Sequence, residues 1–450
     1  MYSPIETLMK SKIFSLIGAL SLACSAQAQN PVVSTWYTTD PAPMVHDNTL
    51  YIYTGHDEGT ESIRADFFWM QEWRVYGTED MVNWRDYGSP LAIESFSWGD
   101  DRAWAPQCIE RNGKFYFYVP LHSKLTGAMA IGVAVGNSPT GPFKDALGKP
   151  LADGSWDYID PTVFIDDDGQ AYLYWGNPKL YYVKLNKDMI SYEGEVQKMD
   201  MSGLKGYTEG PWIQKRNGKY YMMYAADGIP ENIAYAMSDS PVGPWQYKGV
   251  IMPKDEQASF TNHSGLMDFK GHSYFFYHSG WLGGGYGRSV CVKEFEYNAD
   301  GTIPTLHADK EGVAPIATFN PWRRVEAEVM ASKKGNIHSQ PNGVGNVYLS
   351  DIHNGDWVKL REVDFGQRKA KSFTVSASSA LRGGTLELHA DSEKGPKICE
   401  VAITETGGWE KFKTFTTKAV QVPEGKHDIY LVFKGRKGPE LFTLDWWEMK

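Results

Sequence analysis

Between residues 30 and 320, short apolar and aromatic runs recur, each bounded by polar turn residues. Examples are FYFYV, AYLYW, KYYMMYA and SYFFYH, which follow the turns Arg111-Asn-Gly-Lys, Asp167-Asp-Gly, Arg216-Asn-Gly-Lys and Lys270-Gly-His. Aromatic and β-branched runs after such turns predict strands that pair through tight hairpins. Helical periodicity is scarce along the chain, so the pattern predicts an all-β protein.

A longer pattern returns five times in this region. The copies begin at Asp40, Trp104, Asp160, Glu209 and His263, which are separated by 64, 56, 49 and 54 residues. Self-similarity at about 50 residues with several strands per unit indicates a β-propeller, here five-bladed. Because a propeller brings the start of each innermost strand to one axis, we expect the acids at positions 40, 160 and 209 to converge.

The sequence pattern changes near Phe319. From Val325 to Lys450, short strands such as FTVSAS, GTLELHA and HDIYLVFKG alternate with turns, and the repeat is lost. This pattern predicts a β-sandwich (jelly-roll) domain. We therefore expect a propeller over residues 30–318 and a sandwich over residues 322–450.

The N-terminus is typical of an export signal. Lys10 and Lys12 precede the apolar run IFSLIGALSLA, and Ala26-Gln-Ala28 offers a cleavage site, which predicts a signal peptide over residues 1–28. The run is too short to span a membrane, so no transmembrane segment is expected. Cys24 leaves lipoprotein processing as an alternative. The signal predicts export to a bacterial periplasm, the cell surface or the extracellular space.

The composition limits the classes of molecule that the protein is expected to bind. The net charge is −10 and there is no long basic run, which argues against a nucleic-acid partner. The 16 Trp and 26 Tyr suit stacking on sugars, although strand packing also uses many aromatic residues. The scattered Cys108, Cys291 and Cys399 form no disulfide framework.

Three converging carboxylates suggest hydrolysis by acid and base. An inverting glycosidase needs one carboxylic acid to protonate the leaving oxygen and one carboxylate, roughly 6.5–9.5 Å away, to activate water. A third carboxylate beside the acid raises the pKa of that acid, which keeps its proton near neutral pH. The structural alternative is that Asp before Pro only opens a turn.

The residues around these acids carry a resemblance. Asp40-Pro-Ala-Pro, Tyr158-Ile-Asp160-Pro-Thr-Val-Phe and Thr208-Glu209-Gly-Pro resemble the three acidic motifs of glycoside hydrolase family 43, over residues 35 to about 300. The resemblance implies a five-bladed propeller and an inverting mechanism. It implies that Asp40 is the general base, that Glu209 is the general acid, and that Asp160 tunes and orients Glu209.

Three further positions are candidates for substrate or ion binding. His263 resembles the channel histidine that holds a calcium ion through water in many family members and borders the substrate; a buried core histidine is the alternative. Arg288 in GYGRSVCV resembles the active-site arginine of the family, which bonds substrate hydroxyls or a catalytic carboxylate. Trp104 leads the second repeat, so we expect it to form a wall of the sugar site or to plug the channel.

The C-terminal segment resembles carbohydrate-binding module family 6. The matching pieces are Val325-Glu-Ala-Glu328, Ile352-His-Asn-Gly-Asp-Trp357-Val, Thr406-Gly-Gly-Trp409 and Leu444-Asp-Trp446. The resemblance implies that Glu326, Glu328 and Asp445 hold a structural calcium ion and that Trp409 stacks on a sugar. Thr443 stands where sugar-binding members often have Asn, so the domain is expected either to bind sugar or only to buttress the propeller.

Together these features predict an exported inverting glycosidase that acts on plant cell-wall hemicellulose or pectin side chains. Its ligand is expected to be an arabinose- or xylose-containing oligosaccharide or polysaccharide. The leading activity is α-L-arabinofuranosidase. The alternatives are β-xylosidase, endo-arabinanase and a non-catalytic carbohydrate-binding protein. Calcium is the only cofactor expected, with no organic cofactor.

Overall fold

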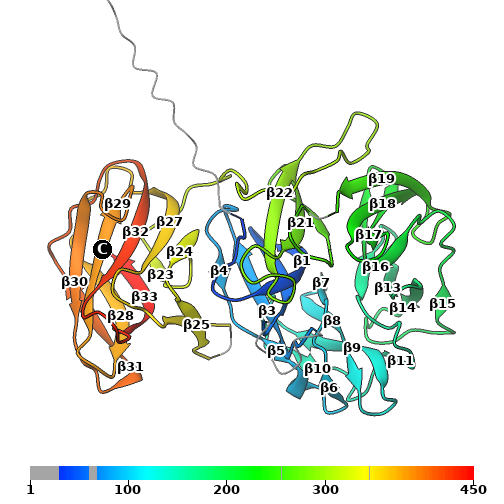
Figure 1. Ribbon diagram of the computed structural model, residues 1–450, viewed down its shortest axis with the longest axis horizontal. Helices are drawn as coiled ribbons and strands as arrows, with labels where there is room; N and C mark the ends of the chain where they lie inside the picture. The colour runs from blue at the N-terminus through cyan, green and yellow to red at the C-terminus, as the bar shows by residue number, and fades with distance from the viewer. Residues whose placement is uncertain (1–29, 60–67, 255, 344) are drawn as a thin grey trace, which may run out of the picture.

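The computed structural model describes residues 30–59, 68–254, 256–343 and 345–450. The predicted signal peptide lies outside these residues. The described chain is built from strands in seven antiparallel sheets, with one short 3-10 helix, η1 (Ile93–Ser95). Figure 1 shows these sheets in two bodies side by side, with the C-terminal body at the left. The prediction of an all-β protein is confirmed.

The first five sheets follow one another along the chain. The first two contain β1 (Thr38–His46), β2 (Thr49–His56), β3 (Glu72–Thr78), β4 (Arg85–Asp86) and β5 (Leu91–Ala92), then β6 (Gly99–Asp101), β7 (Gln107–Arg111), β8 (Lys114–Ser123), β9 (Ala128–Gly136), β10 (Lys144–Asp145) and β11 (Ala152–Asp153). The third contains β12 (Thr162–Ile165), β13 (Ala171–Trp175), β14 (Tyr181–Leu185) and β15 (Gln197–Lys198). The fourth and fifth contain β16 (Tyr207–Arg216), β17 (Lys219–Ala226), β18 (Asn232–Ser238) and β19 (Gln246–Met252), then β20 (Gly265–Phe269), β21 (His272–Ser279) and β22 (Ser289–Phe295).

The hairpins within these sheets form where the turn residues predict them. Strand β7 pairs with β8 from Arg111 opposite Lys114 outward, and the two residues between them, Asn112 and Gly113, both have positive φ, 55° and 72°. That backbone matches the twist of paired strands, and Asn-Gly adopts it with little strain. Asn217-Gly218 repeats the arrangement between β16 and β17.

The first strands of the sheets meet each other in a closed order. Strand β7 contacts β1 and β12, β16 contacts β12 and β20, and β20 returns to β1. Apolar side chains from neighbouring sheets fill the space between them, including Trp73, Phe117, Tyr235 and Phe275. The starts of the first strands therefore gather in one region, which is where the acids of the repeats lie.

The last two sheets pack face to face as a β-sandwich. One contains β23 (Arg324–Glu326), β25 (His338–Pro341), β26 (Val347–Ser350), β28 (Phe373–Ser379), β31 (Gly408–Thr417) and β33 (Thr443–Met449). The other contains β24 (Ser332–Lys334), β27 (Trp357–Asp364), β29 (Gly384–Ala390), β30 (Lys397–Ile403) and β32 (Lys426–Lys434). Both sheets contribute to one apolar core that includes Val375, Leu388, Leu431 and Trp447.

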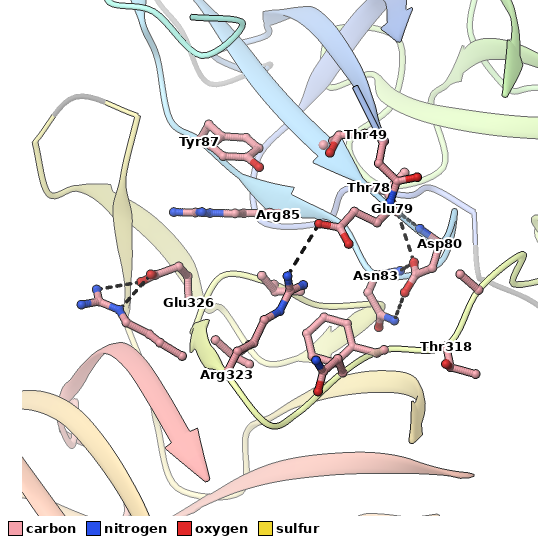
Figure 2. A pocket seen from close by; sticks show the side chains of 18 of the residues that line it. Thr49, Thr78, Glu79, Asp80, Asn83, Arg85, Tyr87, Thr318, Arg323 and Glu326 are labelled. Carbon is pink, nitrogen blue, oxygen red and sulfur yellow. Dashed lines mark hydrogen bonds and ion pairs between the residues drawn. The ribbon is translucent and has the colours of Figure 1, made fainter. Parts of the chain in front are cut away.

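The sandwich is bound to the first sheet by hydrogen bonds and ion pairs. Trp84 and Met330 exchange backbone hydrogen bonds at 2.9 and 3.0 Å, and Asn83 bonds both the carbonyl and the N–H of Arg361 at 2.9 and 2.8 Å. A polar cavity of about 430 Å³ lies between the two bodies (Figure 2). Its lining is charged, and Arg323 faces Glu79 across it at 3.8 Å.

None of the described residues belongs to a helix of the length and apolarity that a membrane crossing requires. The cysteines Cys108, Cys291 and Cys399 are buried and free.

Candidate active site

Asp40 projects from an irregularity at the start of β1. The register between β1 and β2 shifts between Thr39 and Ala42, and Asp40 has a φ of 51°. Such a bulge bends the strand and re-aims one side chain, and left-handed backbone is costly for a residue other than glycine. The side chain of Asp40 is nearly buried, at 6% exposure of the residue.

Asp40 is surrounded by basic groups. Arg288 Nη1 donates to its Oδ1 at 3.3 Å, and His278 Nδ1 lies 3.3 Å from the same oxygen. Burial alone would raise the pKa of Asp40, but the Arg288 charge and the His278 contact outweigh it and hold the pKa well below its usual range. Asp40 is therefore a carboxylate over the whole physiological pH range.

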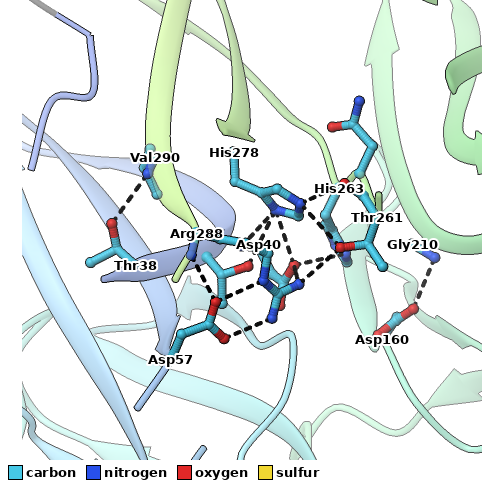
Figure 3. Close-up of polar contacts among 12 residues, drawn as sticks. Thr38, Asp40, Asp57, Asp160, Gly210, Thr261, His263, His278, Arg288 and Val290 are labelled. Carbon is cyan, nitrogen blue, oxygen red and sulfur yellow. Dashed lines mark hydrogen bonds and ion pairs between the residues drawn. The ribbon is translucent and has the colours of Figure 1, made fainter. Parts of the chain in front are cut away.

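A second buried carboxylate, Asp57, holds Arg288 in place (Figure 3). Arg288 Nε and Nη2 donate to Asp57 Oδ2 and Oδ1, both at 2.9 Å, and the Arg288 backbone N–H donates to Oδ2 at 3.0 Å. This two-point pairing fixes the plane of the guanidinium. One face of the guanidinium covers the Phe68 ring at 3.9 Å.

Asp160 lies just before β12 and also has positive φ, 59°. Its Oδ2 accepts the backbone N–H of Gly210 at 2.9 Å, so the acid of the third repeat contacts the residue that follows the acid of the fourth. Burial, followed by the charges of Glu209 and Asp40, raises the pKa of Asp160 well above its usual value.

Glu209 lies near the start of β16, where the register with β17 shifts on either side of it. Asn177 Nδ2 donates to Glu209 Oε2 at 2.5 Å. Burial, followed by the charge of Asp40, raises the pKa of Glu209 to about 7. A carboxyl with that pKa retains its proton in a large fraction of molecules at neutral pH, as a general acid requires.

A fourth acid, Glu231, lies beside this group. Its side chain is buried, and its Oε2 accepts the backbone N–H of Asn262 at 2.7 Å. Burial and the Glu209 charge raise the pKa of Glu231 to about 9, so it is protonated at neutral pH.

His263 lies against Gly210, with Nδ1 3.9 Å from Asp40 Oδ1. Burial lowers the pKa of His263 to about 4, despite the nearby Asp40 charge, so the ring is neutral. On either side of it in the sequence, the buried polar atoms Asn262 Oδ1 and Nδ2 and Ser264 Oγ have no hydrogen-bond partner in the described protein. Such a set fits bound water, and the predicted ion held by His263 through water is compatible with it.

The two candidate tryptophans lie apart from each other. Trp104 is half-buried and donates from Nε1 to the Phe68 carbonyl at 3.2 Å, which places it beside the residue that covers Arg288. Trp409 belongs to β31 of the sandwich, half-buried, and its carbonyl accepts from Thr443 Oγ1 at 3.0 Å. The structure thus brings Trp104, but not Trp409, close to the propeller acids.

The three acids of the sandwich each have a partner in the protein. Arg324 binds Glu326 at 2.9 and 3.0 Å, Arg85 of the propeller binds Glu328 at 3.1 Å, and Asn342 donates to Asp445 at 3.0 Å. No three His, Cys, Asp or Glu side chains form a metal-binding group among residues 30–59, 68–254, 256–343 and 345–450. As placed, Glu326 and Glu328 form ion pairs and Asp445 accepts hydrogen bonds from neutral groups, and calcium here stays a prediction.

The sequence reasoning missed four residues of the site: Asp57, Asn177, Glu231 and His278. Three of them share a position, because Asp57, Asn177 and His278 each lie within two residues of the end of the second strand of a repeat. That strand pairs with the first, so its end lies next to the start of the first strand, where the acid is. A polar residue near the end of the second strand in these three repeats is a signal that the sequence contains.

Comparisons with known proteins match both parts of the chain. The model of the glycosyl hydrolases family 43 matches residues 28–303, and that of carbohydrate binding module family 6 matches residues 326–450. The chain is 33% identical to an arabinoxylan arabinofuranohydrolase of Bacillus subtilis, over 93% of this chain and 92% of the relative. It is also 33% identical to an arabinoxylan arabinofuranohydrolase of Paenibacillus polymyxa, over 93% and 74%.

A solved structure extends the comparison to both domains. The family 43 arabinoxylan arabinofuranohydrolase from Bacillus subtilis in complex with cellotetraose superposes with a TM-score of 0.81 at 30% identity, covering 94% of this chain and 97% of that one. A xylosidase/arabinosidase of Bacteroides ovatus is 32% identical over 61% of this chain and 96% of its own length. The buried acids, their arginine and the match over the propeller together identify the chain as a glycoside hydrolase that belongs to glycosyl hydrolases family 43 and carries a family 6 carbohydrate-binding module.

Proposed function

We propose that the protein is an inverting α-L-arabinofuranosidase that releases arabinose side chains from a plant cell-wall polysaccharide. The observation that carries the proposal is that the pKa values of two neighbouring carboxyls are shifted in opposite directions. Arg288 and His278 keep Asp40 ionised, while burial and the Asp40 charge raise the pKa of Glu209 to about 7. Two acids with separated pKa values are what an acid–base pair needs.

In this proposal Asp40 is the general base. It accepts a proton from water as the water oxygen attacks the anomeric carbon. Its low pKa makes it a weak base, but guarantees that it is ionised when substrate arrives. Arg288, fixed by Asp57, sets the position of the carboxylate.

Glu209 is the general acid. It gives its proton to the glycosidic oxygen as the bond to the anomeric carbon breaks, and the leaving group departs as an alcohol. Asn177 holds one oxygen of Glu209, which leaves the other oxygen available for the proton.

Asp160 tunes and orients Glu209. The electrostatic repulsion between the two acids is mutual, so the pair retains one proton to higher pH than either acid alone. The bond from Gly210 N–H to Asp160 also fixes the backbone next to Glu209.

We infer that the five sheets are the five blades of a propeller, since their first strands contact one another in a closed order. Trp104, beside Phe68, would form a wall of the sugar site, and Trp409 would stack on sugar in the sandwich. The likeness in sequence to arabinoxylan arabinofuranohydrolases over 93% of the chain supports arabinose as the released sugar.

A calcium ion is proposed at His263, held through water by the neutral ring and the unpartnered groups of Asn262 and Ser264. Bound there, it would supply a fixed positive charge near the acids. Treatment with EDTA should then lower activity, and added Ca²⁺ should restore it. Export is proposed from the N-terminal sequence, and fractionation of the native host tests it.

β-Xylosidase activity is the second candidate, because relatives matching about three fifths of the chain are named xylosidase/arabinosidase. A screen with aryl α-L-arabinofuranoside and aryl β-D-xyloside decides between the two, and a linear arabinan tests endo-arabinanase action. Glu209→Gln tests the non-catalytic alternative. We expect it to nearly abolish sugar release from arabinoxylan while sugar binding persists. Equal release by the variant and the wild type would contradict an enzymatic role for Glu209.

A further inference from the structure

The sandwich inserts two side chains of β25 into the edge of the first sheet. Ser339 is 1% exposed, accepts the Trp36 Nε1–H at 2.7 Å and donates to Asp86 Oδ2 at 2.5 Å. Its neighbour His338 contacts the Thr35 carbonyl at 2.7 Å, and the His338 ring lies 4.9 Å from the Trp36 ring.

Arg74 of β3 completes this contact from the propeller side. Its Nη2 donates to Ser339 Oγ at 3.2 Å and to Asp86 at 3.1 Å, and its Nη1 donates to Glu72 at 2.8 Å. The guanidinium also lies over the Trp36 ring at 5.1 Å. Ser339 is thus bonded at once to a buried cation, a buried anion and an indole.

The same residues reach the end of β2. The Trp36 ring meets the edge of the His56 ring at 5.1 Å, and His56 Nδ1 lies 3.1 Å from the Glu72 oxygen that Arg74 binds. The next residue is Asp57, whose carboxylate holds Arg288, which in turn holds Asp40. A continuous set of contacts between buried and half-buried side chains therefore joins the sandwich to the catalytic centre.

We propose that Ser339 is a positioning residue of the active site. It fixes Trp36 and Arg74, which in turn fix the end of β2. At that end, Asp57 keeps Arg288 on Asp40. The importance of Asp40 in this chain of contacts rests on the proposed function. The sandwich then acts on catalysis as part of the catalytic structure, besides any sugar binding of its own.

The chemistry of the contact makes Ser339 sensitive to change. Ser339→Ala leaves the N–H of the half-buried Trp36 without its acceptor and removes a bond from each of the buried Asp86 and Arg74 side chains. Unpartnered buried polar groups are costly, so Trp36 and Arg74 are expected to shift or loosen. Misplacement of a catalytic group by an ångström lowers the rate by about 100-fold in other enzymes.

Asn83→Ala is the matched control. Asn83 also bonds the sandwich, through Arg361, but it has no bond to Trp36, Arg74 or β2. This variant shows how much stability and activity are lost when the interface between the domains is weakened by itself.

The experiment measures kcat and KM of the full chain for the better of the two aryl glycosides, with melting temperatures. We expect Ser339→Ala to lower kcat by about tenfold with little change in KM, a split that indicates a lost transition-state contact. We expect Asn83→Ala to lower the melting temperature but not kcat, and Ser339→Thr, which keeps a hydroxyl, to restore most of kcat. Equal kcat in Ser339→Ala and Asn83→Ala would overturn the proposal.

A second readout does not depend on activity. With ¹⁵N-labelled arginine, the Arg288 Nε–H resonance, assigned with Arg288→Lys, reports its hydrogen exchange with solvent. We expect this exchange to be at least about tenfold faster in Ser339→Ala than in Asn83→Ala, because a loosened Asp57 releases the guanidinium. Equal exchange would overturn the coupling even in an active enzyme. An inactive wild type with faster exchange in Ser339→Ala would refute the proposed function alone.

Discussion

Asp160 accepts the backbone N–H of Gly210 at 2.9 Å, which ties the acid of one repeat to the backbone beside the acid of the next. The bond restrains the backbone next to Glu209, and the Glu209 charge, after burial, raises the pKa of Asp160. Both carboxyls have raised pKa values. In the proposed mechanism this contact orients Glu209, while burial and the Asp40 charge raise the pKa of Glu209 to about 7.

The wild-type pH profile follows from these shifts. The pKa of Glu209 is raised to about 7, so kcat/KM should fall above pH 7 as the acid loses its proton. The pKa of Asp40 is held well below its usual range by Arg288 and His278, so the acid limb should lie far below pH 4. Initial rates between pH 4 and 9 test both limbs, and an acid limb near pH 5 or 6 would contradict the assignment of the base.

Asp160→Asn should shift the alkaline limb to lower pH. The amide oxygen can still accept the Gly210 N–H, but the repulsion that helps Glu209 keep its proton is lost. We expect kcat at pH 7 to fall by about tenfold or more and to recover in part at lower pH. An unchanged alkaline limb of the pH–rate profile would mean that Asp160 is itself protonated in the active enzyme and does not raise the pKa of Glu209.

Arg288→Lys should lower kcat/KM by about 100-fold. An ammonium group cannot bind Asp57 at two points and reach Asp40 as well, since it lacks the planar fork of the guanidinium. The acid limb should also move to higher pH, because Asp40 loses part of the charge that stabilises its ionised form. Circular dichroism of the variant serves as the folding control, and a native spectrum with wild-type kinetics would exclude this role.

Arg85→Met should destabilise the contact between the two domains, by about 2 kcal/mol at neutral pH. Glu328 would lose its cation while buried, and burial already raises the pKa of Glu328. An acid whose folded pKa lies above its unfolded pKa destabilises the fold as pH rises past the unfolded value and not below it. The loss of unfolding free energy in the variant, relative to wild type, should therefore become smaller toward pH 4. A pH-independent loss in urea titrations would contradict this origin.

The acids Asp40, Asp160 and Glu209 could be predicted as candidates for one site because each leads a repeat, and the hairpins could be predicted because Asn-Gly pairs favour one turn. The left-handed backbone of Asp40 and Asp160 could not. It arises where the first strands meet in a closed ring, and it depends on neighbours about 50 residues or more away. The partners Asp57, Asn177 and His278 carry a positional signal, since each lies within two residues of the end of a second strand.

Other features of the structure cannot be predicted from a single sequence. The contact of Ser339 with Trp36 and Arg74 joins residues that are 303 and 265 positions apart, and nothing local marks the serine. Likewise, Glu328 resembles a calcium ligand by motif, while the structure gives it Arg85 as a partner. Long-range pairing of this kind follows from how the two domains dock, which local patterns do not encode.

The most direct test of the central claim, that Asp40 and Glu209 act as base and acid in a single displacement, is the configuration of the first sugar released. Hydrolysis of an aryl α-L-arabinofuranoside is followed by proton NMR from the earliest time points, with Glu209→Gln as the inactive control. We expect that β-L-arabinofuranose forms first and that the α-anomer grows in only by mutarotation. Initial release of the α-anomer would contradict it, because retention requires a covalent intermediate on one of these acids.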